Sequence, residues 1–225
     1  MKYFYLIILP ILFSCAKKTH DIPLRNYFPS EEGRKYVYNY TNNNKNFGST
    51  ESVLIKVKIK DNPDVYCYVA PDEISSTNPT LASYHFLEGI FCFSGDTVKI
   101  SPRFTLLEPD TASIYNQFQP FFKPFVNIKD EITIKFSQEI IYTYRISKYE
   151  KVKTPMGKFN CIKIDYTRYD LVPLNMRGND FILYEGVNYP AFSKTASAWL
   201  AADIGMIKWE RYTGRIDKLK SYSKK

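Results

Sequence analysis

Residues 142–166 read YTYRISKYEKVKTPMGKFNCIKIDY, and this stretch decides the fold class. On both sides of its centre, at residues 142–146 and 160–166, apolar and polar residues alternate. A period of two is typical of a β-strand with one buried face. Between the two arms, Pro155 presets a turn and Gly157 accepts a positive φ. The stretch therefore predicts two strands joined by a tight antiparallel hairpin.

The same period recurs in other parts of the chain. Residues 51–60, ESVLIKVKIK, place Val and Ile on one face and Lys on the other, as in a half-buried strand. Residues 36–40 carry three tyrosines on one face, and residues 199–212 predict a tight turn that leads into a strand. There is no internal repeat and no long amphipathic helix. We expect one mainly β domain that spans residues 26–214.

The composition is that of a globular protein. Of 225 residues, 44% are hydrophobic, 24% charged and 16% aromatic, which excludes a disordered or collagen-like chain. The formal charge of +8 would attract polyanions such as nucleic acid or anionic lipid headgroups. We expect no nucleic-acid partner, because an exported chain rarely meets DNA. Positive charge that simply keeps the protein soluble is the alternative interpretation.

The amino terminus has the pattern of a bacterial lipoprotein precursor. Lys2 is followed by an apolar run at residues 3–13, too short to span a bilayer but typical of a secretory signal. The run ends Leu12-Phe13-Ser14-Cys15, which resembles a lipobox, although small residues are commoner than Phe at its second position. The resemblance implies cleavage after residue 14 and lipidation of Cys15, with two or three acyl chains as a stable membrane anchor.

The two ends of the chain are expected to lie outside the domain. Residues 15–25 begin with a polar stretch without apolar periodicity, as expected for a lipidated tether. Such a tether resembles those of outer-membrane lipoproteins that face the periplasm. Residues 215–225 contain five basic residues and one acidic residue, which predicts a solvated basic tail.

Three cysteines remain besides Cys15. Cys67 and Cys92 are flanked by aromatic residues in predicted strands and could form a disulfide across the sheet. Cys161 would then be left unpaired, and three buried thiols are the alternative. Residues 108–125 combine three prolines with five aromatic residues, and could form a flap over an apolar cavity or a loop that packs onto the core.

Three motifs together resemble a group of uncharacterised exported bacterial lipoproteins. They are an opening strand with Phe-Pro, Gly and aromatic-X-Tyr at residues 27–38, the Pro-X-Gly hairpin at 152–164, and an Ile-Lys-aromatic closing strand within 199–209. The fold of that group is similar to the open sheets of lipoprotein carriers. The resemblance implies a curved antiparallel sheet or half-barrel with few short helices and a concave apolar face. Tyr36 replaces the Trp common in the group, and residues 170–197 do not align clearly.

The sequence has no motif for catalysis, metal binding or cofactor binding. It contains two histidines and lacks a phosphate loop, a serine elbow and a CxxC pair, so we expect neither an enzyme nor a cofactor. One hypothesis is a membrane-anchored protein that binds a lipid or other apolar ligand on a concave surface formed by Tyr36, Tyr38, Tyr40 and Trp209. The alternative is a structural or protein-interaction lipoprotein with a filled core, whose partner is an envelope protein. An apolar cavity of several hundred Å³ would favour the first hypothesis.

Overall fold

The computed structural model describes eight stretches of the chain. They are residues 22–42, 45–57, 64–69, 90–101, 118–125, 127–135, 138–173 and 176–223. One short 3-10 helix, η2 (Leu24–Tyr27), precedes the strands. The strands are β1 (Lys35–Asn42), β2 (Lys45–Val57), β3 (Val65–Val69), β4 (Ile90–Ser94), β5 (Thr97–Ser101), β6 (Gln119–Pro120), β7 (Glu131–Lys135), β8 (Ile140–Thr154), β9 (Gly157–Leu171), β10 (Asp180–Tyr184), β11 (Val187–Ala201), β12 (Gly205–Glu210) and β13 (Arg215–Ser223).

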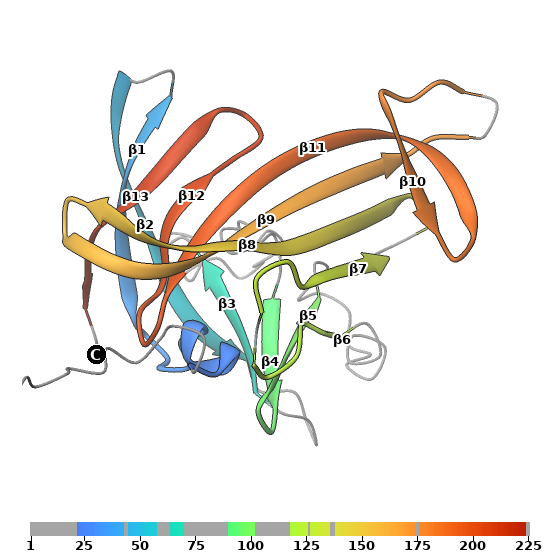
Figure 1. Ribbon diagram of the computed structural model, residues 1–225. Helices are drawn as coiled ribbons and strands as arrows, with labels where there is room; N and C mark the ends of the chain where they lie inside the picture. Colours follow the sequence, from blue (N-terminus) through green and yellow to red (C-terminus); the bar gives the residue numbers. More distant parts are fainter. Residues whose placement is uncertain are drawn as a thin grey trace, which may run out of the picture.

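The strands form a single antiparallel sheet that curls on itself (Figure 1). Their order is β6-β5-β4-β3-β2-β1-β13-β12-β11-β9-β8-β7, and β10 pairs with β11 off this path. The two ends of the sheet approach each other, since Phe121, next to β6, contacts Tyr144 of β8 with ring centroids 5.1 Å apart. A mainly β single domain with a curved antiparallel sheet is confirmed.

The predicted hairpin is confirmed as the turn between the two long strands β8 and β9. Thr154 pairs with Gly157, so Pro155 and Met156 form a two-residue loop. Gly157 has a φ of 149°, a conformation that side chains rarely adopt. The hydroxyl of Thr154 accepts a hydrogen bond of 3.2 Å from the backbone N–H of Met156.

In β2 the strand is confirmed, but the alternating Val and Ile residues do not supply its core face. Leu54 is fully buried in the core, whereas Ile55 is only half-buried. The register explains this choice, because β1 pairs Tyr36 with Ser52. Directly paired residues share a face, so the inward tyrosines of β1 place Ser52 and Leu54 inside.

The predicted basic tail is wrong. Residues 215–223 form β13, which lies between β1 and β12 inside the sheet. The number of basic residues suggested a solvated tail, but in a strand these residues can all lie on the outer face. Leu219 is buried, while Lys218 and Lys220 on either side of it are exposed. Asp217 is also buried, and its charge is compensated by Arg211 and Arg215 at 3.0 and 2.7 Å.

Candidate functional site

The concave side of the sheet is filled by aromatic side chains. Tyr36, Tyr38 and Trp209, which we expected to line a ligand surface, are at most 2% exposed. Tyr36 stacks on Tyr38 with ring centroids 6.2 Å apart and contacts Tyr68 at 5.2 Å. The rings of this proposed surface therefore pack against other side chains of the chain itself.

The polar atoms of these rings also have partners inside the domain. The Tyr36 hydroxyl donates to the carbonyl of Ile204 at 2.8 Å, and the Tyr38 hydroxyl donates to that of Met206 at 3.1 Å. The indole N–H of Trp209 donates to the Tyr166 hydroxyl at 2.7 Å. Burial raises the pKa of both Tyr36 and Tyr38, so both hydroxyls stay neutral hydrogen-bond donors.

The expectation of an accessible apolar ligand surface at these residues is therefore wrong. Tyr40, the fourth predicted residue, is half-buried at the end of β1. Its ring stacks on Phe47 at 6.3 Å, and the guanidinium of Arg215 lies 4.1 Å from its centroid. The sequence showed that the tyrosines share one face of a strand, but the curl of the sheet decides what covers that face.

The described part of the proline-rich segment packs onto the core, as the second interpretation of residues 108–125 predicted. Phe118, Phe121 and Phe122 are buried, whereas Phe125 is exposed. Phe121 contacts Phe28 at 5.8 Å, which joins this segment to the N-terminal part of the domain. Residues 102–117 lie outside the described residues.

The strand register counts against a bond between Cys67 and Cys92. Cys92 of β4 pairs with Val65 of β3, which places Cys67 two residues further along the sheet. Diagonal neighbours of this kind are about 7–8 Å apart, beyond the usual span of a disulfide. The side chain of Cys67 is not among those described, so the disulfide stays a prediction. Cys161 is buried as a free thiol, as expected.

A projecting hairpin, formed by β10 and the start of β11, carries exposed apolar side chains (Figure 1). We call residues 176–192 the β10–β11 arm. Half of the exposed large hydrophobic residues in the described part of the chain belong to it: Met176, Phe181, Leu183, Val187 and Phe192. Along β10 the exposure alternates, since Phe181 is 60% exposed, Ile182 7% and Leu183 69%. One face of β10 is thus anchored and the other is open to solvent.

Local sequence explains how the arm forms. Tyr184 pairs with Val187, so Glu185 and Gly186 form a two-residue loop. Both have positive φ, 49° and 81°, as a type I′ turn requires. Residues 181–184, FILY, followed by this turn were a signal for a hairpin that our sequence analysis missed.

A groove of about 480 Å³ runs between the arm and the outer surface of β7, β8 and β9. Phe181, Ile182 and Leu183 form the wall on the arm. The opposite wall is polar and includes charged residues from three strands: Glu131, Arg145 and Asp165. The groove therefore joins an apolar wall to a hydrogen-bonding wall, which is the chemistry of a polypeptide surface rather than of a hydrocarbon chain.

Asp165 is held in the ionised state at the base of this groove. Burial would raise the pKa of its carboxyl, but hydrogen bonds from Lys163 and Ser197 outweigh burial and hold the pKa below its usual value. The ammonium of Lys163 lies 2.7 Å from this carboxylate. Next to it on the outer surface, Trp199 lies under the ammonium groups of Lys163 and Lys208, at 5.1 and 4.0 Å from the ring centroid.

No group of three or more His, Cys, Asp or Glu residues that could hold a metal ion occurs among the described residues. The expectations that the chain is not an enzyme and has no cofactor stay predictions. In the same part of the chain, no helix has the length and apolarity needed to cross a bilayer. Cys15, the predicted lipidation site, lies outside the described residues, as does the signal segment before it.

Comparisons with known proteins give a partial match. Residues 124–224, which include β7 to β13, match the family described as DUF3108-like. This segment contains the predicted hairpin and closing motifs but not the opening strand. No curated protein matches the sequence.

Two solved structures are similar to the chain. A candidate lipoprotein from Parabacteroides distasonis has 14% identity and a TM-score of 0.45, covering 90% of this chain and 100% of that one. A candidate exported protein with a YmcC-like fold, from Bacteroides fragilis, has 13% identity and a TM-score of 0.43. Its match covers 88% of this chain and 98% of that one.

Proposed function

We propose that the protein is a lipid-anchored component of the bacterial cell envelope that binds another envelope protein through the β10–β11 arm. The exposed apolar face of the arm carries this proposal. Phe181 and Leu183 are more than half exposed although they follow each other on one strand face. Contiguous exposed apolar residues on a folded domain usually mark a contact site for a partner.

The anchor is supported by the sequence Leu12-Phe13-Ser14-Cys15 and by the polar stretch that follows it. Acyl chains on Cys15 would hold the domain at a membrane surface. The absence of clustered acidic residues after Cys15 supports the outer membrane, with the domain facing the periplasm. Labelled fatty acid should be incorporated into the wild-type chain and not into Cys15→Ala. Equal incorporation into both would contradict the anchor.

Binding of a small apolar ligand has less support than binding of a protein. The aromatic residues that would hold an acyl chain are buried against each other and hydrogen-bonded within the domain. The groove beside the arm is walled largely by polar and charged side chains. Saturable uptake of a fluorescent fatty acid, weakened by Trp209→Ala in a variant shown to be folded, would restore the ligand hypothesis.

Site-specific crosslinking in intact cells tests the arm. A photoreactive amino acid at Leu183 should give a discrete protein adduct, whereas the same group at Phe47 should not. Phe47 is a suitable control because it is also more than half exposed but lies on β2, away from the arm. Phe181→Glu should abolish the Leu183 adduct, because the partner would have to cover a buried charge. Adducts of equal yield at both positions, or none at Leu183, would contradict the proposal.

A further inference from the structure

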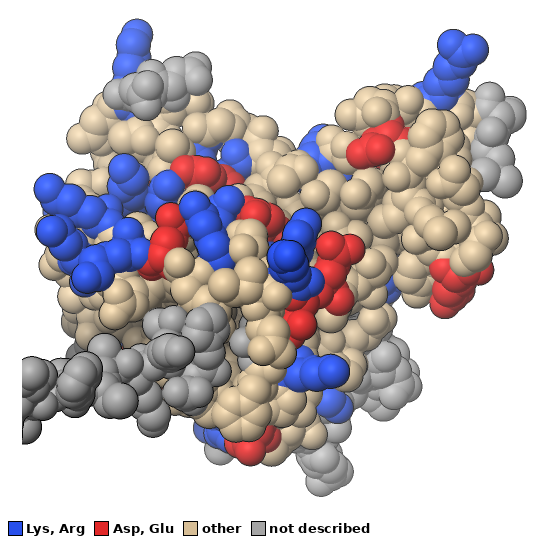
Figure 2. All heavy atoms as spheres, in the orientation of Figure 1, with Lys and Arg blue, Asp and Glu red and all other residues tan. Residues whose placement is uncertain are grey.

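Three exposed lysines share one face at the end of the β8–β9 hairpin. Lys153 pairs directly with Lys158, and Lys151 pairs with Asn160. Paired residues and residues two apart lie on the same side of a ribbon, so Lys151, Lys153 and Lys158 form one surface. We call this surface the lysine face. Figure 2 shows Lys and Arg side chains gathered over this end of the molecule.

The described part of the chain supplies no counter-charge to the lysine face. None of the three lysines forms an ion pair with any described carboxylate. Glu150 alternates to the opposite side of β8, where it accepts a hydrogen bond from the indole of Trp199 and pairs with Lys148 at 3.0 Å. Like charges that face each other across two strands destabilise a sheet. The Lys153–Lys158 pair therefore costs stability in the isolated domain, and an external anion between the two ammonium groups would relieve the repulsion.

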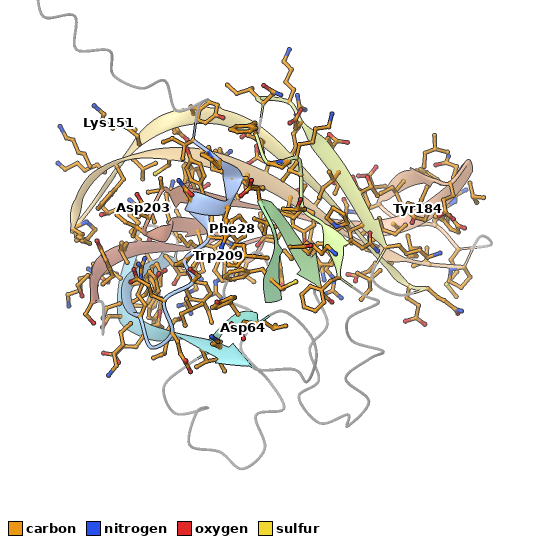
Figure 3. All side chains as sticks on the ribbon, turned by 90° about the horizontal axis from the view of Figure 1, so that it is seen from below. Phe28, Asp64, Lys151, Tyr184, Asp203 and Trp209 are labelled. Atoms are coloured by element: carbon orange, nitrogen blue, oxygen red, sulfur yellow. The ribbon has the colours of Figure 1, made fainter. Side chains whose placement is uncertain are left out.

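The N-terminal segment lies near the part of β8 that precedes the lysine face. Tyr149, two residues before Lys151, packs against the core and interacts electrostatically with Tyr27 of η2. Figure 3 shows Lys151 at the same end of the molecule as Asp203, whose backbone N–H donates to the carbonyl of Asn26 at 2.7 Å. The N-terminal segment around Asn26 therefore lies at the same end of the domain as the lysine face.

Chain length limits how far this end can lie from the anchor. Six residues lie between Cys15 and Ile22, which are therefore seven Cα–Cα steps apart. A fully extended chain spans at most about 3.6 Å per residue, so Ile22 stays within about 25 Å of the lipidated residue. An arrangement with the N-terminal segment towards the membrane also brings the neighbouring hairpin towards it.

We propose that the lysine face lies against the anionic phospholipid headgroups of the membrane that holds the anchor. This inference rests on the proposed anchoring through Cys15. The lysines attract phosphodiester groups over roughly one Debye length, and they fix which end of the domain faces the bilayer. The acyl chains supply the membrane affinity, and the lysine face supplies the orientation.

Vesicle partitioning without the acyl chains tests the lysine face by itself. The chain from residue 15 with Cys15→Ser should sediment with vesicles of equal phosphatidylglycerol and phosphatidylcholine but not with pure phosphatidylcholine. Each basic residue at an anionic surface contributes about fivefold to partitioning, so Lys153→Gln with Lys158→Gln should lower the partition coefficient about 25-fold. Both side chains are exposed and repel each other, so this variant should be no less stable than its parent.

The matched control also removes two positive charges. Lys45 at the β1–β2 turn and Arg177 in the arm are exposed, and Lys45→Gln with Arg177→Gln should leave partitioning nearly unchanged. Equal losses in the two variants would show that only net charge matters and would overturn the inference, as would no binding to the anionic vesicles. Fatty-acid labelling of Cys15 is an independent measurement, so a labelled chain without lysine-dependent partitioning contradicts the lysine face alone.

Discussion

Asp217 is buried between two arginines that also cover aromatic rings. Arg211 lies 3.9 Å from the ring centroid of Trp209, and Arg215 lies 4.1 Å from that of Tyr40. Asp217→Ala would leave two guanidinium groups without their carboxylate in a partly buried site. We expect a loss of about 3–5 kcal/mol in the free energy of unfolding, measured by urea denaturation. Asp96→Ala, at an exposed turn, should change it by less than about 0.5 kcal/mol; comparable losses would contradict this role.

Asp165 should make the stability of the domain depend on acid pH. Its pKa is below the usual value in the folded state, so the unfolded chain takes up a proton first as pH falls. The stabilisation is present above the unfolded pKa of about 3.9 and is lost as pH falls through the lower folded value. Between neutral pH and about pH 3, Asp165→Asn should therefore lose less stability than the wild type. If the urea midpoints of the wild type and of Asp165→Asn fell equally over this pH range, the result would contradict this role of Asp165.

The sequence of a strand predicts which residues share a face, but the neighbouring strands decide which of the two faces points into the core. Tyr36 and Tyr38 were correctly placed on one face, yet they were expected to remain accessible. They are buried because the sheet curls until Phe121 reaches Tyr144. That contact joins two different segments, 23 positions apart, and no local pattern encodes it. The same limit applies to β2, where Ser52 lies inside because it pairs with a tyrosine.

At the scale of elements, the β10–β11 arm depends on a glycine. A Cβ built on Gly178 would lie 2.2 Å from the carbonyl oxygen of Ala191, far inside contact distance. Gly178→Ala must therefore displace the connection before β10 or the start of β11. We expect the arm to open locally, seen as faster hydrogen exchange at residues 180–184, while β8 and β9 keep their protection. Gly186→Ala provides a comparison, because nothing lies within 4 Å of its Cβ and only its φ of +81° is strained. Unchanged exchange in Gly178→Ala would contradict the close approach.

Elements with strong local signals were predicted, and elements defined by long-range pairing were not. The β8–β9 hairpin has two alternating arms and a Pro-X-Gly turn, so neighbouring residues specify it. β13 was predicted as a basic tail because its pairing with β1, which is far away in the sequence, cannot be recognised from its own residues. Its pairing with β1, which includes Tyr38 with Leu219, places the strand inside the sheet between β1 and β12.

At the scale of the molecule, the lysine face and the β10–β11 arm lie at opposite ends of the same long strands. β8 has 15 residues, which at about 3.3 Å per residue spans roughly 50 Å. Figure 3 shows Lys151 and Tyr184 at opposite ends of the domain. If the lysine face lies against the membrane, the arm extends into the aqueous compartment. A partner protein could then reach Phe181 and Leu183 without competing with the bilayer.

This arrangement predicts different depths for two labelled positions. In the lipidated protein on anionic vesicles, a fluorophore attached at Lys153→Cys should be quenched by nitroxide-labelled headgroups, because the hairpin lies near the surface. The same fluorophore at Leu183→Cys should be unaffected, since quenching needs close approach and the long strands separate the two sites by tens of Å. Replacing Lys151 and Lys158 with Gln should weaken quenching at position 153 while the acyl chains keep the protein bound. Quenching at position 183 equal to that at 153 would show that the domain lies flat or turns freely, and would contradict an arm that projects from the membrane.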